Sequence, residues 1–170
     1  IIGLSLGSFA TALAWRVPRG LQWIFSKKGG EPERSRCTSC GAVLCWRDLV
    51  PLISWIAQKG RCRYCGMAIP RRYPLIELLV LAGVAGVYAV YGFNAESAVL
   101  MAALPFLVAL LAVDAERMIL PDQLTLICGL IGLAFITISA PQDGWAAAWA
   151  WQGLAAILYG ALLWLTGFIT

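Results

Sequence analysis

Long stretches without a charged side chain constrain this chain most strongly. Residues 101–113 read MAALPFLVALLAV, and residues 123–140 also contain no charged residue. Only 13% of the 170 residues are charged and 61% are hydrophobic, whereas soluble domains carry roughly 25% charged residues. A soluble core cannot bury so large an apolar fraction. We therefore predict an integral membrane protein.

The hydrophobic runs predict an all-α polytopic membrane protein with about five transmembrane helices. The expected spans are residues 1–14, 75–90, 96–113, 124–140 and 154–169. A full span needs about 20 residues, so we expect the first helix to be truncated and the natural start to be missing. Its small residues Gly3, Gly7 and Ser8 favour close helix packing. We expect Pro105 to kink its helix, and Glu77 to lie in a first turn, where the helix dipole favours a carboxylate.

The distribution of basic residues predicts the topology. Twelve of the thirteen Lys and Arg lie between Arg16 and Arg72, against three of the nine acidic residues. The positive-inside rule places this segment in the cytoplasm. Residues 1–17 then form the first transmembrane helix, residues 18–72 a basic cytoplasmic domain, and residues 73–170 the other spans. Membrane topology and anionic lipid explain the positive charge, so we expect lipid rather than nucleic acid as a partner.

The cysteines predict a metal site in the cytoplasmic domain. Four of the six form two CxxC pairs, at Cys37, Cys40, Cys62 and Cys65. Each pair is followed by Gly, which lets the backbone turn so that both sulfurs face one ion. Twenty-one residues lie between the pairs, close to the spacing of four-cysteine zinc sites. We therefore predict a structural zinc ion.

Two features leave alternatives to this zinc site. Cys45 and Cys128 lie outside the CxxC pattern; we interpret both as bystanders, with Cys45 as an alternative ligand. A dithiol redox pair is the other interpretation of a CxxC motif. The chain contains no His, which removes imidazole acid–base chemistry and every zinc site that requires His.

Residues 114–122, DAERMILPD, place four charges between two apolar runs. Asp122 follows Pro121, and we interpret it as the cap of the next helix. Asp114 comes directly after an apolar run, at a helix C-terminus, where the helix dipole disfavours an anion. This placement points to a function, with a solvated helix boundary as the alternative. Arg117 could simply pair with Asp114 or Glu116. By alternation from the basic segment, the stretch is cytoplasmic.

Several blocks, taken in order, resemble one known family. They are CTSCG at 37–41, PLISW at 51–55, GRCRYCG at 60–66 and IPRRYPLIELL at 69–79. Earlier in the chain stand Gly7-Ser8-Phe9 and Arg16-Val17-Pro18, and later Asp114 with Leu120-Pro121-Asp122. Together they resemble the bacterial prepilin peptidases, the type IV leader peptidases, which are membrane aspartic proteases of the GxGD type.

The resemblance implies an activity and its cofactors. Asp114 matches the first catalytic aspartate, and Cys37, Cys40, Cys62 and Cys65 match the metal-binding cysteines. Family members sit in the bacterial inner membrane and remove the basic leader peptide of type IV prepilins or type II secretion pseudopilins on the cytoplasmic side. Many then methylate the new N-terminus with S-adenosylmethionine.

The chain departs from the family at its second catalytic aspartate. That residue lies in a Gly-x-Gly-Asp motif, which does not occur in these 170 residues, and we expect it beyond Thr170. An aspartic protease needs two carboxylates that share one proton, so this chain supplies half of the pair. Two other classes remain open. One is a membrane thiol oxidoreductase, and the other is a non-enzymatic secretion-system assembly protein with a zinc module.

Overall fold

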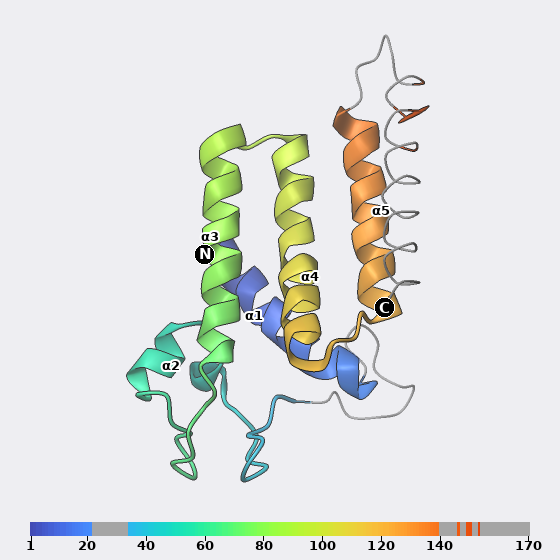
Figure 1. The fold of residues 1–170 in the computed structure, drawn as a ribbon. Helices are drawn as coiled ribbons and strands as arrows, with labels where there is room; N and C mark the ends of the chain where they lie inside the picture. Colours follow the sequence, from blue (N-terminus) through green and yellow to red (C-terminus); the bar gives the residue numbers. More distant parts are fainter. Residues whose placement is uncertain (22–33, 140–145, 147–148, 151–152, 154–170) are drawn as a thin grey trace.

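A computed structural model describes residues 1–21, 34–139, 146, 149–150 and 153. Its elements are four longer helices, a short helix and two 3-10 turns, and Figure 1 shows three of the longer helices standing side by side. The longer helices are α1 (Ile2–Arg16), α3 (Arg72–Tyr91), α4 (Ala95–Arg117) and α5 (Asp122–Ser139). The others are η1 (Val17–Arg19), η2 (Trp46–Asp48) and α2 (Ile53–Ala57).

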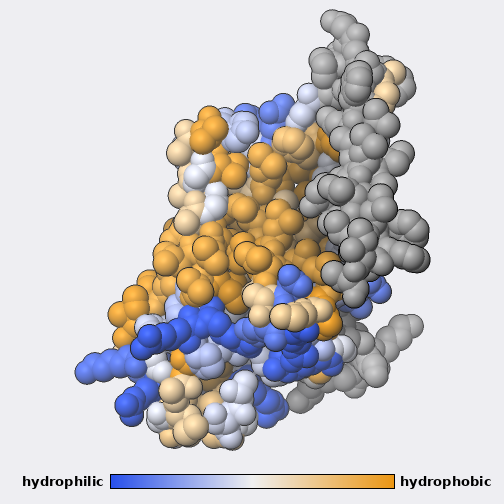
Figure 2. Space-filling view, viewed as in Figure 1, coloured by the Kyte–Doolittle hydropathy of each residue, from blue (hydrophilic) through white to orange (hydrophobic). Residues whose placement is uncertain are grey.

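Three of these helices have the length and composition of membrane spans. They are α3, α4 and α5, which match the predicted spans 75–90, 96–113 and 124–140. Figure 2 shows a hydrophobic band over α3 and α4, with most of the hydrophilic residues gathered at the end that carries residues 34–71. The predicted membrane character and all-α class therefore agree with the described residues, which contain only two isolated β-bridges outside the helices.

The count of five spans and the domain boundaries stay predictions. Helix α1 has 15 residues, fewer than the roughly 20 that cross the hydrocarbon. The predicted span 154–169 lies outside the described residues.

The core of the bundle lies where α1 meets α3 and α4. Ala10, Leu13, Val80 and Val113 are among its fully or nearly fully buried side chains. At Gly7 the backbones of α1 and α3 come so close that a Cβ atom added to Gly7 would lie 2.9 Å from Cα of Glu77. The predicted packing role of the small residues in α1 is therefore confirmed at this position.

The two ends of α4 are set by local interactions. At its start, the Asn94 side chain accepts a hydrogen bond from the backbone N–H of Ser97 at 2.7 Å, which satisfies a free helix N–H group. At its end, Met118 takes the left-handed conformation and its N–H donates to the carbonyl of Asp114 at 2.8 Å. Asp114 therefore lies in the last turn, as predicted, and α5 begins at Asp122. Pro105 lies inside α4.

The predicted position of Glu77 is wrong. Helix α3 begins at Arg72, three residues before the predicted body of the span at 75–90, because the fixed φ and missing N–H of proline suit the first turn of a helix. Glu77 therefore lies beyond the first turn. Its carboxylate accepts a hydrogen bond from the backbone N–H of Leu52 at 2.7 Å. The position of the Glu77 carboxylate is therefore explained by its hydrogen bond to the loop that contains Leu52, and not by the helix dipole.

The close approach of α1 and α3 gives a first prediction. Gly7→Ala should destabilise the protein by about 1–3 kcal/mol, because its Cβ would meet backbone atoms of Glu77 that cannot rotate away. Gly86→Ala in α3 is the control, since no atom lies within 4 Å of its added Cβ. Thermal unfolding in detergent measures both. Equal melting temperatures for the two variants would contradict the packing role of Gly7.

Candidate functional site

The two CxxC pairs fold into two matching turns. Gly41 and Gly66 each have φ of +70°, a conformation that favours glycine. In the first turn the N–H of Cys37 donates to the carbonyl of Ala42 at 2.9 Å, and in the second the N–H of Cys62 donates to the carbonyl of Met67 at 2.8 Å. An isolated β-bridge closes each turn, Arg36 to Val43 and Arg61 to Ala68. The repeated sequence RCxxCG at 36–41 and 61–66 is the signal for this duplication, and sequence reasoning missed it.

The four cysteine sulfurs converge on one point. Those of Cys37, Cys40, Cys62 and Cys65 all lie within 4.8 Å of one another. The sulfurs of Cys37 and Cys65 are 3.9 Å apart. A tetrahedral zinc site with Zn–S bonds of about 2.3 Å requires sulfur–sulfur distances of about 3.8 Å. The donor set and its geometry therefore fit a zinc ion, which the four cysteines would hold.

The pKa values of two of these thiols, Cys37 and Cys65, are shifted in opposite directions. Backbone N–H groups of Cys40 and Ser39 lower the pKa of Cys37 to about 6. The Met67 N–H acts in the same direction on Cys65, but desolvation and the neighbouring thiols outweigh it and raise its pKa to about 12. A bound divalent ion would favour the thiolate form of both Cys37 and Cys65.

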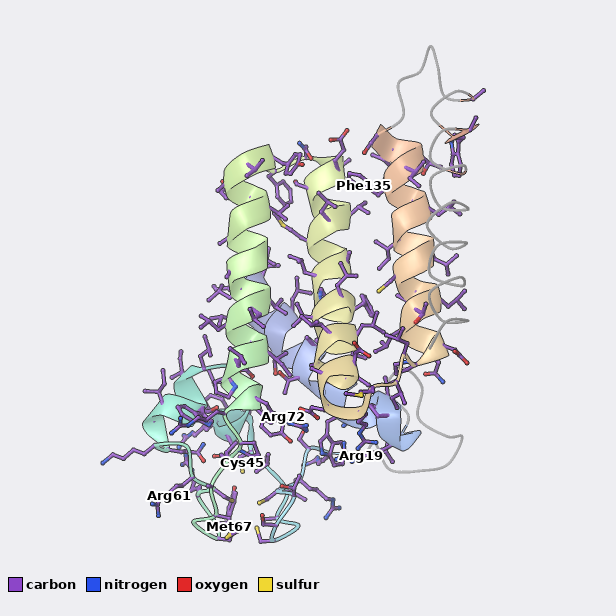
Figure 3. The ribbon with its side chains drawn as sticks, in the orientation of Figure 1. Arg19, Cys45, Arg61, Met67, Arg72 and Phe135 are labelled. Carbon is purple, nitrogen blue, oxygen red and sulfur yellow. The ribbon has the colours of Figure 1, made fainter. Side chains whose placement is uncertain are left out.

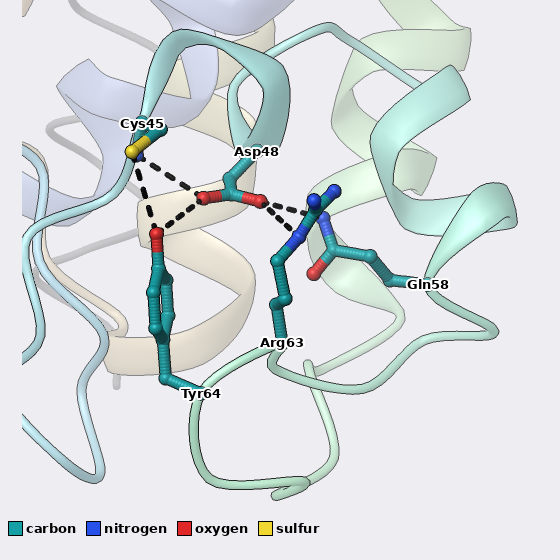
Figure 4. A network of polar contacts seen from close by, with 5 residues as sticks. All are labelled: Cys45, Asp48, Gln58, Arg63 and Tyr64. Carbon is teal, nitrogen blue, oxygen red and sulfur yellow. Dashed lines mark hydrogen bonds and ion pairs between the residues drawn. The ribbon is translucent and has the colours of Figure 1, made fainter.

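A buried carboxylate joins the second turn to η2 and α2. The side chain of Asp48 is only 4% exposed and forms an ion pair with Arg63 at 3.0 Å. It also accepts hydrogen bonds from the Tyr64 hydroxyl, the Cys45 N–H and the Gln58 amide at 3.1–3.3 Å (Figure 4). Sequence reasoning missed Asp48, although it is the only acid between residues 34 and 76.

Cys45 belongs to this polar network rather than to the sulfur cluster. The hydroxyl of Tyr64 lies 3.4 Å from its sulfur. The hydrogen bond with Cys45, followed by desolvation and the contact with Asp48, raises the pKa of Tyr64 to about 12. Within the described residues Cys45 is outside the group that could hold an ion, which agrees with its interpretation as a bystander.

Asp114 lies at the end of the bundle where the cysteine turns are found. Figure 3 places the labelled residues Arg72, Cys45 and Arg61 at that end. Asp114 is exposed, and the structure does not bring it into the sulfur cluster. The next charges are engaged: Glu116 forms an ion pair with Arg72, and Arg117 donates to the carbonyl of Pro18 at 3.3 Å. Arg117 thus has a partner other than the neighbouring acids.

A cavity of about 350 Å³ lies between residues 34–70, α1 and α3. This volume is in the range of small-molecule sites. Its lining residues include Trp15, Trp55, Tyr73 and Glu77. Asp114 does not line it. The cavity and the exposed aspartate are therefore separate candidate sites at the same end of the protein.

A family model described as the bacterial peptidase A24 N-terminal domain matches residues 1–91, more than half of the chain. The chain belongs to this family. A prepilin leader peptidase/N-methyltransferase of Myxococcus xanthus is 36% identical over 79% of this chain and 38% of its own length. One of the same name from Aeromonas salmonicida is 36% identical over 74% of this chain and 50% of its own length.

A third relative, from Escherichia coli O78:H11, is a type 4 prepilin-like proteins leader peptide-processing enzyme. It is 30% identical over 98% of this chain and 66% of its own length. The chain thus spans between 38% and 66% of the length of these three A24 relatives. No solved structure matches it significantly.

The sulfur cluster gives a second prediction. The purified protein should contain about one zinc ion per chain, and Cys62→Ser should remove most of it, because the remaining three thiolates leave the site one ligand short. Elemental analysis by mass spectrometry measures the metal. Cys45→Ser is the matched control and should retain zinc. Zinc loss in Cys45→Ser with retention in Cys62→Ser would contradict the assignment of ligands.

Proposed function

We propose that the complete protein containing this chain is a membrane aspartic endopeptidase. It removes the leader peptide of type IV prepilins or type II secretion pseudopilins at the cytoplasmic face of the bacterial inner membrane. The observation that carries this proposal is the similarity to relatives named prepilin leader peptidases, at 30–36% identity over 74–98% of the chain. The exposed Asp114, at the end of the bundle that carries the cysteine turns, supports it.

In this proposal Asp114 supplies one of two catalytic carboxylates. One carboxylate of such a pair activates a water molecule as general base, while the protonated partner polarises the scissile carbonyl. These 170 residues contain no Gly-x-Gly-Asp motif, so the partner is proposed to come from a residue outside them. The position of Asp114 in the last turn of α4 supports access to both water and a cytoplasmic peptide.

The zinc ion is proposed to be structural. Four thiolates complete a tetrahedral shell and leave no open position for a substrate or a water molecule. Both CxxC pairs converge on one centre, which supports a metal site over the alternative of a thiol oxidoreductase. The alternative of an assembly protein without enzyme activity requires that Asp114 be dispensable, and the substitution below decides this.

We also propose that the enzyme methylates the new N-terminus with S-adenosylmethionine, because relatives are named N-methyltransferases. The cavity between residues 34–70, α1 and α3 fits such a ligand in volume and chemistry. Indole rings can stack on a purine, and a carboxylate attracts a cationic sulfonium or ammonium group. Trp15, Trp55 and Glu77 would hold the cofactor, which supplies the methyl group.

The third prediction tests the catalytic role of Asp114. Asp114→Asn in the complete protein should lower the rate of leader cleavage by roughly 10²–10⁴-fold or more, because an amide cannot act as the base. Cleavage of a purified prepilin, followed by mass spectrometry, measures the effect. Asp122→Asn should keep its activity, since Asp122 is the first residue of α5 and has no catalytic role in this proposal. Retained cleavage in Asp114→Asn would refute the protease assignment for this residue.

The fourth prediction tests the cavity. Trp15→Leu should weaken binding of S-adenosylmethionine by roughly 10-fold, the loss expected for one aromatic contact, and should leave leader cleavage intact. Isothermal titration calorimetry measures the affinity. Trp46→Leu is the control, because Trp46 is 71% exposed and does not line the cavity. An equal loss of affinity in both variants would show that the cofactor binds elsewhere.

A further inference from the structure

The turn that carries Asp114 is fastened to both ends of the predicted cytoplasmic domain. Glu116 forms an ion pair with Arg72, the first residue of α3. Arg117, the next residue, donates a hydrogen bond to the carbonyl of Pro18 at 3.3 Å. Pro18 is the first residue of the domain predicted at 18–72 and Arg72 is the last. We call these two contacts the clasp.

The clasp is poorly explained as a device for helix stability. Arg72 places a positive charge at the N-terminus of α3, and Glu116 places a negative charge in the last turn of α4. Each charge stands where the helix dipole disfavours it. The side chains are 30% and 38% exposed, and surface ion pairs contribute only about 0–1 kcal/mol. The arrangement therefore fixes an orientation more than it stabilises the fold.

The Arg72 side of the clasp is held in place. Its guanidinium lies 4.9 Å from the ring centroid of Tyr73 and donates to the Tyr73 hydroxyl at 3.4 Å. These contacts restrict the rotamers of Arg72 before it meets Glu116, so that less side-chain entropy is lost in forming the pair. Arg72 can therefore set the position of the turn to which Glu116 belongs.

The domain between the two clasp points is itself cross-linked. The four sulfurs join its two turns, Asp48 joins η2 to the second turn, and Leu52 donates to Glu77 of α3 at 2.7 Å. With these links in place, residues 34–71 are joined to α3, whose first residue is Arg72, and Pro18 follows α1, which packs closely against α3. A displacement of residues 34–71 can then reach the last turn of α4 through the pair of Arg72 and Glu116.

We propose that Arg72 and Glu116 are positioning residues for Asp114. Through them the metal-bound cytoplasmic domain sets where the Asp114 carboxylate meets its partner and the substrate. The inference rests on the proposed catalytic role of Asp114. Glu116 lies two residues after Asp114 in the same helical turn, and a misplacement of about 1 Å in a reacting group can cost roughly 10²-fold in rate.

The fifth prediction concerns single substitutions in the complete protein. Arg72→Gln and Glu116→Gln should each lower kcat for leader cleavage by about 10- to 100-fold and leave KM within about twofold. Zinc content and melting temperature should stay close to those of the wild type, because an exposed pair contributes little to stability. Prepilin cleavage kinetics, elemental analysis and thermal unfolding provide these measurements.

Two controls separate positioning from a general loss of charge. Arg71→Gln removes the neighbouring exposed arginine, which has no contact with α4 within the described residues, and should keep its kcat. The double variant Arg72→Glu with Glu116→Arg restores the pair with reversed charges. Both charges then agree with the helix dipoles, so the swap should fold and should recover kcat to within about threefold of the wild type.

The outcomes distinguish this inference from the proposed function. The positioning role of Arg72 and Glu116 is refuted if Arg72→Gln leaves kcat unchanged. It is also refuted if the charge-swapped double variant folds but does not recover kcat. In both cases Asp114→Asn still tests the protease assignment independently. Retained cleavage in Asp114→Asn overturns the catalytic role of Asp114 and the clasp with it. Equal losses in Arg71→Gln and Arg72→Gln would assign the effect to the basic surface and also overturn the clasp.

Discussion

The convergence of four cysteine sulfurs is the interaction on which residues 34–71 of this structure depend. Between residues 34 and 71 the only buried hydrophobic residue is Cys62, so this segment has no hydrophobic core of its own. Small units of this kind are held by metals or disulfides. With four thiolates within 4.8 Å of one another, a zinc ion can replace the missing core.

Polar contacts then transfer that local order to the membrane helices. Asp48 collects four donors around one buried carboxylate, Glu77 accepts from the backbone of Leu52, and Arg72 pairs with Glu116. None of these contacts buries much apolar area. These contacts fix the relative orientation of the groups they join, because a hydrogen bond constrains an angle as well as a distance. Residues 34–71 are thus joined to the bundle by few but geometrically specific interactions.

What the sequence predicted follows from local patterns. Uncharged runs predicted α3, α4 and α5 to within a few residues, and CxxC spacing predicted the sulfur cluster. Contacts between distant residues leave no such pattern: Arg72 and Glu116 are 44 residues apart. Glu77 was misplaced because the helix begins before Pro74, at Arg72. The partners of Asp48 depend on how two turns pack, which spacing alone does not specify.

The last turn of α4 combines a long-range contact with an exposed acidic side chain. It contains two carboxylates, Asp114 and Glu116, at a helix end whose dipole disfavours both. Arg72 offsets the charge of Glu116, and within the described residues no hydrogen bond or ion pair engages the carboxylate of Asp114. One acid of the turn is thereby used for attachment and the other remains accessible. A helix end optimised for stability would carry neither, so the pair of acids is better explained by the proposed catalytic role of Asp114 than by how α4 folds.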